Sequence, residues 1–291
     1  MEIKIDSVIL KNYNEMFAIY ESLVDLFNRS NVELVILDSE IDTDSYYYIK
    51  SHRSSVTEGN TTTEGEFTRL VFEIVNDNTN YVVPKKAHDE TYEITNLKKV
   101  YDYLQASKQY NRVVLQRAHA IIGEDIYKND LLIHRGRLKN KNNYVPFYYE
   151  GSLYLKSFSK VEHVKNELDN LFSSWKTLAD DSPGEIFAKF VILQLEVISI
   201  HPFNDGNGRV ARGFSESYIE SMGFIPYTPY SREYKKVYQD EMGTFSVMSQ
   251  RSIEDAYIAF ATFILKSYQE NVEEVIQTIE KLSESMDDIV S

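Results

Sequence analysis

The sequence predicts a mainly α-helical fold, because apolar residues recur at helical spacing and one segment is apolar on nearly every face. A helix that is apolar all round belongs in the centre of a domain. The segment Ser182-Pro183-Gly184-Glu185 marks its start, with an N-cap serine, a proline at the first helical position and a glutamate at the third. The apolar residues that follow are Ile186, Phe187, Phe190, Val191, Ile192, Leu193, Leu195, Val197, Ile198 and Ile200. We therefore expect a central buried helix that ends beside His201.

Further helices are expected on both sides of this central helix. The periodic segments are 13–27, 41–56, 93–104, 113–122, 161–175 and 253–282, the last of which forms one helix or two. Another helix is expected after 206–208, ending near Met222 with Gly223 as its C′ residue. Segments 32–37 and 69–75 fit a strand or a helix, and 76–88 is expected as a connection with a short edge strand at 81–84. Residues 131–159 are β-like, and Pro146 there indicates an edge strand.

The composition is that of an ordinary globular protein, and it disfavours some classes of binding partner. The 291 residues are 43% hydrophobic and 26% charged, with a formal net charge of −14. This charge argues against nucleic acid or an anionic membrane as the main partner. The absence of cysteine excludes disulfides, and no segment has the pattern of a signal peptide or a membrane span, so we expect a cytoplasmic location. No linker separates 1–90, 91–225 and 226–291, which we expect to form one compact unit.

Residues 201–212 read His-Pro-Phe-Asn-Asp-Gly-Asn-Gly-Arg-Val-Ala-Arg and concentrate the chemistry of the chain. His201 titrates in the range that suits a general base near neutral pH. Asp205 supplies a hard carboxylate of the kind that Mg²⁺ prefers. Pro202 and Phe203 have no such chemistry and are expected to hold the turn by packing.

The second half of this run predicts an anion site. Gly206, Asn207 and Gly208 permit a sharp turn, and the unpaired N–H groups of the helix that follows attract an anion. Arg209 and Arg212 are three residues apart, so we expect both on one helix face beyond the site. The run as a whole indicates transfer at a phosphate.

The run resembles, at every defined position, the signature of the Fic family, His-Pro-Phe-x-Asp/Glu-Gly-Asn-Gly-Arg-x-x-Arg. The resemblance implies an all-helical bundle with a β-hairpin flap, here near 135–159, that holds a target protein by strand addition. It also implies transfer of AMP from ATP to a protein hydroxyl, with His201 as the base and Mg²⁺ on Asp205. Residues 206–208 would cradle the phosphates, Arg212 would grip the γ-phosphate, and Arg209 would support the chain of phosphates.

A second motif, Ser54-x-x-x-Glu58-Gly59, resembles the inhibitory motif that accompanies Fic domains, in the class II position before the signature. In that family the glutamate pairs with the last arginine of the signature, here Arg212, and blocks the seat of the γ-phosphate. Read locally, Ser55 and Glu58 fit a capping box and Gly59 fits a helix C′ residue.

Other functions and partners remain open at this level. They include removal of AMP by Glu58 and His201, transfer of UMP, phosphocholine or phosphate, and a silent nucleotide-sensing module. Self-modification and a homo-oligomer also remain open, whereas a DNA-binding regulator is disfavoured by charge. His119 lies beside an apolar stripe and is interpreted as a core histidine.

Overall fold

The structure is a computed structural model, and it describes residues 2–34, 50–51, 54–55, 85–124, 135–173, 181–225, 227 and 232–290. The segments expected at 69–75, 81–84 and 131–133 lie outside these ranges, as do Glu58, Gly59 and most of the expected segments 32–37 and 41–56.

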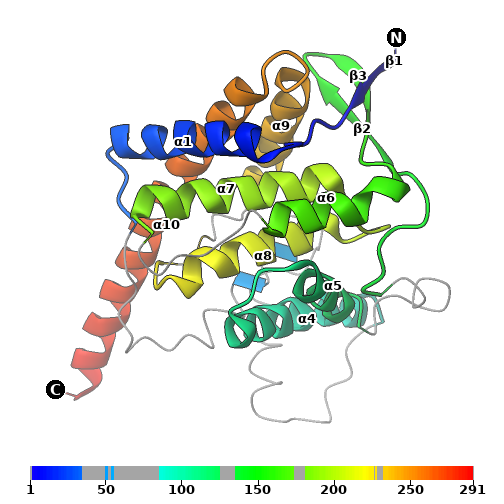
Figure 1. Cartoon of the computed structure of the whole chain (residues 1–291). Helices are drawn as coiled ribbons and strands as arrows, with labels where there is room; N and C mark the ends of the chain where they lie inside the picture. Colours follow the sequence, from blue (N-terminus) through cyan, green and yellow to red (C-terminus); the bar gives the residue numbers. More distant parts are fainter. Residues whose placement is uncertain are drawn as a thin grey trace.

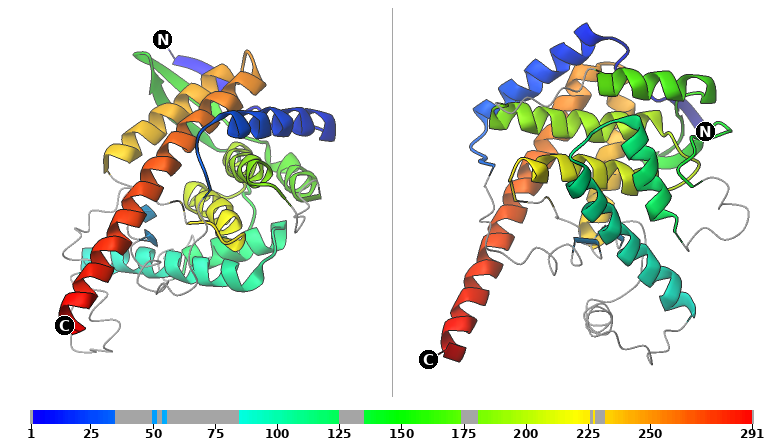
Figure 2. Two further views of the ribbon diagram at one scale, coloured as in Figure 1. Left: turned by 90° about the vertical axis from the view of Figure 1, so that its left-hand side faces the viewer. Right: turned by 60° about the horizontal axis from the view of Figure 1, so that its bottom comes forward.

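Helices dominate the described residues, as predicted (Figure 1). Their bounds are α1 Tyr13–Arg29, α4 Lys85–Ser107, α5 Arg112–Ile122, α6 Val161–Ser173, α7 Pro183–Ile200, α8 Asn207–Ser221, α9 Arg232–Met248 and α10 Ile253–Val290. In Figure 1 the order from top to bottom is α1, α7, α8 and α4, and each helix packs on the next. Helix α10 packs on α9, α1 and α7, and its C-terminal end extends beyond the other helices (Figure 2). None of the described helices combines the length and apolarity that crossing a membrane requires.

The central helix is α7, and its start and burial are as predicted. The Ser182 hydroxyl accepts a hydrogen bond from the Glu185 N–H, and the Glu185 carboxylate accepts one from the Ser182 N–H at 2.7 Å. From Ile186 to Ile200 only Lys189 and Ile198 are not fully buried. His201 therefore follows directly from a helix that is held rigidly in the core.

The small sheet has the strand order β1–β3–β2. Strands β2 (Tyr144–Tyr149) and β3 (Ser152–Ser157) form the predicted hairpin, joined by a turn at Glu150 and Gly151 with φ values of 46° and 75°. Strand β1 (Glu2–Asp6) pairs parallel with β3 and was not predicted from the sequence. Among the described strands, β2 is thus an edge, as Pro146 indicated.

Two sequence expectations were wrong or incomplete. Helix α4 begins at Lys85, inside the segment 76–88 expected as a connection. Helix α9 was not predicted, because its buried face rests on Tyr234, Tyr238 and Phe245 amid polar residues. The segment after Ile253 is one helix, the first of the two alternatives.

A buried carboxyl group joins the N-terminal segment, α7 and α10. Glu196 on α7 is 1% exposed and accepts hydrogen bonds from the Tyr257 hydroxyl and from the Leu10 N–H. Burial raises the pKa of Glu196 to about 8. The folded chain therefore holds this proton at pH values where an unfolded chain, with a pKa near 4.5, has released it.

Stability should consequently fall as pH rises from 6.5 to 8, by up to about 1.4 kcal/mol per pH unit from this group. Glu196→Gln should flatten this slope, because the amide does not titrate. Urea unfolding at several pH values measures the effect, with Glu162→Gln, at an exposed site on α6, as the charge-matched control. An equal slope in wild type and Glu196→Gln would contradict the assignment of a neutral Glu196.

Candidate active site

His201 lies in the turn between α7 and α8, in a left-handed conformation with φ 53° and ψ 61°. Its N–H donates to the Val197 carbonyl at 3.0 Å, and its ring stacks on Phe158 at a centroid distance of 3.8 Å. Nδ1 lies 3.4 Å from the Ile198 carbonyl oxygen. A proton on Nδ1 would donate to this carbonyl and leave the lone pair on Nε2, which is the form that a general base requires.

Helix α8 begins with Gly206 as its N-cap, at φ 73° and with no side-chain cap. The Asn207 side chain instead closes the preceding turn: its oxygen accepts from the Phe203 N–H at 2.8 Å, and its amide donates to the Phe203 carbonyl at 2.9 Å. The first-turn N–H groups of α8 and the helix dipole make this end favourable for an anion. Asn207 can thus serve a phosphate through its backbone, while its side chain fixes the turn.

Asp205 is the candidate metal ligand, and its side chain is 64% exposed. One carboxylate oxygen accepts from the Gly206 N–H at 2.7 Å, and the other lies 3.9 Å from Arg209. The described residues contain no cluster of three or more histidine or acidic side chains that could enclose a metal ion. A single exposed carboxylate fits Mg²⁺, which commonly binds one or two carboxylates, waters and substrate phosphates.

The two arginines point to different neighbours. Arg209 forms an ion pair with Glu93 on α4, so its guanidinium is held on the side of α8 that faces that helix. Arg212 is 2% exposed and lies over the ring of Tyr238 on α9, 5.8 Å from its centroid. Arg212 lines the larger of the two cavities described below, whereas Arg209 lies beside Asp205, with 3.9 Å between its guanidinium and the carboxylate.

Two cavities meet at His201. The larger has a volume of about 490 Å³ and lies between the hairpin, the start of α8 and the inner face of α9, with Arg212 and Tyr238 among its walls. The smaller, of about 310 Å³, is lined by Asp205 and residues 206–208. His201 and Gly208 line both. His201, Gly208 at the helix start and Arg212 therefore border the same larger cavity.

His119 holds the turn from behind and is a core residue, as interpreted from the sequence. It is 2% exposed, stacks on Phe203 at 3.8 Å, accepts from the Gly136 N–H at Nδ1 and donates from Nε2 to the Asp205 carbonyl, both at 3.0 Å. Burial lowers its pKa to about 4. A neutral His119 thus positions the residue that is the candidate metal ligand.

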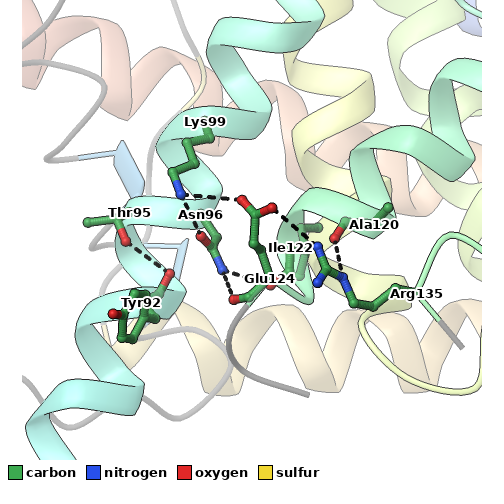
Figure 3. Close-up of polar contacts among 8 residues, drawn as sticks. All are labelled: Tyr92, Thr95, Asn96, Lys99, Ala120, Ile122, Glu124 and Arg135. Atoms are coloured by element: carbon green, nitrogen blue, oxygen red, sulfur yellow. Dashed lines mark hydrogen bonds and ion pairs between the residues drawn. The ribbon is translucent and has the colours of Figure 1, made fainter. Parts of the chain in front are cut away.

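The partner of His119, Gly136, is itself fixed by contacts around the end of α5. Figure 3 shows Arg135 donating to the Ala120 carbonyl at 3.1 Å and pairing with Glu124, which also pairs with Lys99 on α4. Gly136 has φ 68°, and a Cβ there would lie 2.8 Å from the Gln116 carbonyl oxygen. Only glycine can lie so close to the Gln116 carbonyl, and this position lets its N–H donate to His119.

The loop before β2 clasps the same turn, and sequence reasoning missed its role. The Lys139 N–H donates to the Pro202 carbonyl at 2.8 Å, and the Asn143 side chain donates to the Phe203 carbonyl at 3.0 Å. Phe203 is fully buried, in agreement with its predicted packing role. The basic, asparagine-rich composition of this loop was visible in the sequence, but the partners are about 60 residues away and no local pattern identifies them.

A short piece of the chain that carries Ser54 lies against α8. Ser54 and Ser55 are buried, and Lys50 one turn earlier is fully buried. The Lys50 ammonium pairs with Glu216 at 3.2 Å and with Glu220, both on α8. Glu58 and Gly59 themselves lie outside the described residues, so the predicted pairing of Glu58 with Arg212 stays a prediction.

Comparison with known proteins agrees with this architecture. Residues 109–218 match the sequence model of the Fic/DOC family. The "Protein adenylyltransferase Fic" of Nematostella vectensis is 27% identical over 183 residues, which cover 62% of this chain and 39% of that protein. The chain thus spans well under two thirds of that relative.

Solved structures show the same fold at low sequence identity. Fic-1 (residues 134–508) from C. elegans superposes with a TM-score of 0.62 at 16% identity, covering 92% of this chain and 73% of the other. A Fic family protein from Desulfovibrio desulfuricans gives 0.60 at 15% identity, covering 92% and 76%. The chain therefore contains a segment, residues 109–218 with the signature, that matches the Fic/DOC family, and it shares its fold with these solved Fic structures.

Proposed function

We propose that the protein is an adenylyltransferase that moves AMP from ATP to a hydroxyl group of a target protein and is restrained by Glu58. The observation that carries this proposal is the single space bordered by His201, the start of α8 and Arg212, with the hairpin as its roof. The name of the Nematostella vectensis relative supports the same activity.

In the proposed reaction His201 Nε2 accepts the proton of the target hydroxyl. The hydroxyl oxygen then forms a bond to the α-phosphorus of ATP, and the bond from that phosphorus to the bridging oxygen breaks to release pyrophosphate. Backbone N–H groups at the start of α8 and the Arg212 guanidinium would stabilise the negative charge on the phosphates. The left-handed turn and the Phe158 stacking keep the imidazole in place for this step.

Mg²⁺ is the cofactor that we propose for Asp205, shared with the phosphates of ATP. When bound, it would neutralise phosphate charge. The exposed Asp205 side chain and the adjacent 310 Å³ cavity support this placement.

The proposed docking site for the target is the edge strand β2 and its loop, within 135–159. Tyr144 and Tyr148 are 57% and 72% exposed, which is unusual for large aromatic side chains. An extended target segment could pair with the open edge and place its hydroxyl near His201. Pro146 has no N–H to offer, so pairing would depend on the N–H and carbonyl groups of its neighbours.

The contacts of Lys50 support the autoinhibition part of the proposal. Its ion pairs fasten the chain before Glu58 to α8, the helix that also carries Arg212. Ser55 is only three residues before Glu58, and three residues span at most about 10 Å. A glutamate tethered so closely competes with phosphate for the fork of Arg212.

Glu58→Gly should raise transfer of label from α-labelled ATP to protein, because the competing carboxylate is gone. Adding His201→Ala to that variant should lower transfer by about 10²- to 10⁴-fold, the usual contribution of a general base. Label on the chain itself or on proteins of an added lysate would show where AMP goes. If no form transfers label although all remain folded, the adenylyltransferase proposal fails.

Lys50→Met should also raise transfer, toward the level of Glu58→Gly, because the anchor is lost while Glu58 is kept. The change removes a buried cation that pairs with Glu216 and Glu220, and breaking a buried ion pair typically costs about 3–5 kcal/mol, so a melting curve must accompany the assay. Arg29→Met, which breaks an exposed ion pair on α1, is the control and should leave transfer unchanged. A folded Lys50→Met protein with wild-type transfer, beside an active Glu58→Gly protein, would refute the anchoring role.

Asp205→Asn should raise the Mg²⁺ concentration needed for half-maximal ATP binding by about tenfold or more, since a carboxylate ligand is lost. Calorimetric titration of ATP at several Mg²⁺ concentrations measures this shift. Asp240→Asn, at a carboxylate that lines the larger cavity instead, is the control. An unchanged Mg²⁺ requirement in Asp205→Asn would rule out the proposed ligand.

A further inference from the structure

We propose that Lys156 recognises the base of the bound nucleotide by donating a hydrogen bond from Nζ to an acceptor on the base, a ring nitrogen in the case of adenine. This inference rests on the proposed function, because it assigns one end of the same cavity. Lys156 lies on β3 and lines the larger cavity together with His201 and Arg212.

Lys156 is a buried cation with few partners. It is 5% exposed, and no described carboxylate lies within ion-pair distance of it. Its ammonium donates to the Ser246 hydroxyl oxygen on α9 at 2.9 Å and lies 5.3 Å and 5.9 Å from the ring centroids of Phe158 and Phe245. Burial lowers the pKa of Lys156 to about 8, so the side chain is still largely charged at neutral pH.

One hydrogen bond does not satisfy an ammonium group, which has three donors. Ser246 cannot do more, because its own hydrogen is donated to the Met242 carbonyl at 2.7 Å. The aromatic rings offset part of the cost of burying the charge, but they accept no conventional hydrogen bond. A buried donor that faces a cavity in this way is suited to an acceptor atom of a ligand.

The position of Lys156 distinguishes the base from the phosphates. Arg212 lies over Tyr238, and Lys156 bonds to Ser246, which is eight residues later on the same helix α9. Eight residues correspond to about 12 Å along a helix axis. If the phosphates extend along the start of α8 and Arg212, Lys156 is at the far end of the cavity, where an extended nucleotide places its base.

The hairpin, which covers this end of the cavity, packs closely on α9. A Cβ at Gly243 would lie 3.2 Å from the ring of Phe147 on β2, so the missing side chain lets this ring approach α9. Phe147, Gly243 and Lys156 all line the cavity. A flat apolar wall beside a single donor is the usual composition of a site for an aromatic ring with polar edges.

The chemistry of lysine limits which edge it can read. The ammonium donates and never accepts, so it favours a ring nitrogen or a carbonyl oxygen and disfavours an exocyclic amino group at the same place. Adenine must therefore present one of its ring nitrogens to Lys156, with its amino group directed elsewhere.

Lys156→Met tests the inference in the Glu58→Gly/His201→Ala protein, which should bind nucleotide without turnover. We expect the ATP dissociation constant to rise about tenfold, the loss of one charge-assisted hydrogen bond, while that of inorganic tripolyphosphate stays the same. Calorimetry with Mg²⁺ measures both. Equal weakening of both ligands would assign Lys156 to the phosphates, and no weakening of ATP would leave it a purely structural link between β3 and α9; either result overturns the proposal.

A second measurement needs no change to Lys156. The three ATP analogues that lack ring nitrogen 1, 3 or 7 should bind the parent protein unequally, and the weakest should lose no further affinity in Lys156→Met. Equal binding of ATP and all three analogues by the parent would also overturn the proposal. A parent that binds neither ATP nor tripolyphosphate would overturn the proposed function as well, which separates the two failures.

Discussion

The structure depends on the turn that joins α7 to α8, because every candidate catalytic group is on it or beside it. This turn has left-handed residues at both ends, His201 and Gly206, and little regular backbone pairing of its own. Its carbonyl groups are satisfied from elsewhere, by His119, by the Asn207 side chain and by residues of the loop before β2. Each such bond contributes only about 1 kcal/mol net, yet a buried carbonyl left without a partner costs more. The turn therefore keeps one conformation, because any other would leave buried carbonyl groups without hydrogen bonds.

His119 contributes strongly to holding this turn, and it can make both of its hydrogen bonds only when its ring is neutral. Its Nδ1 must accept from Gly136 while its Nε2–H donates to Asp205, and a second proton would remove the acceptor. Burial keeps the pKa near 4, so the ring remains neutral through the physiological range. A histidine outside the signature therefore fixes the position of Asp205, the residue just before the N-cap of α8.

The parts predictable from sequence were those whose physical cause is local. The start of α7 follows from Ser182 and Glu185, three residues apart, and its burial follows from an apolar surface without a polar face. The turn and α8 follow from the glycines at 206 and 208. Strand β1 could not be predicted, because Glu2–Asp6 becomes a strand only by pairing with β3, some 150 residues later. Helix α9 was missed for a related reason. Its few buried aromatic residues are buried by packing on α10 and by lining the cavity, and neither contact is visible in the local sequence.

The site residues divide in the same way. His201, Asp205 and Arg212 were recognised because they fall in one motif, whereas Lys139, Asn143 and Lys156 bind partners 60 to 90 residues away and show no pattern of their own. The different environments of Arg209 and Arg212 were also out of reach, since they depend on Glu93 of α4 and Tyr238 of α9. Glu58 was reached only through the resemblance of its motif, and it lies outside the described residues.

The two ends of the larger cavity are built from different parts of the chain, and this separation bears on how inhibition would work. The end proposed for the phosphates is lined by α8, whose Glu216 and Glu220 pair with Lys50. The other end belongs to β3 and α9, and the described contacts of its donor Lys156 are with Ser246, Phe158 and Phe245, which are not on α8. A glutamate that occupies Arg212 would therefore compete with the phosphates and leave the base site intact. Under the proposed function, an inhibited protein would still hold ATP by its base, with the α-phosphorus out of line for the hydroxyl that His201 activates, and release of the inhibitory segment would correct the pose without building a new site.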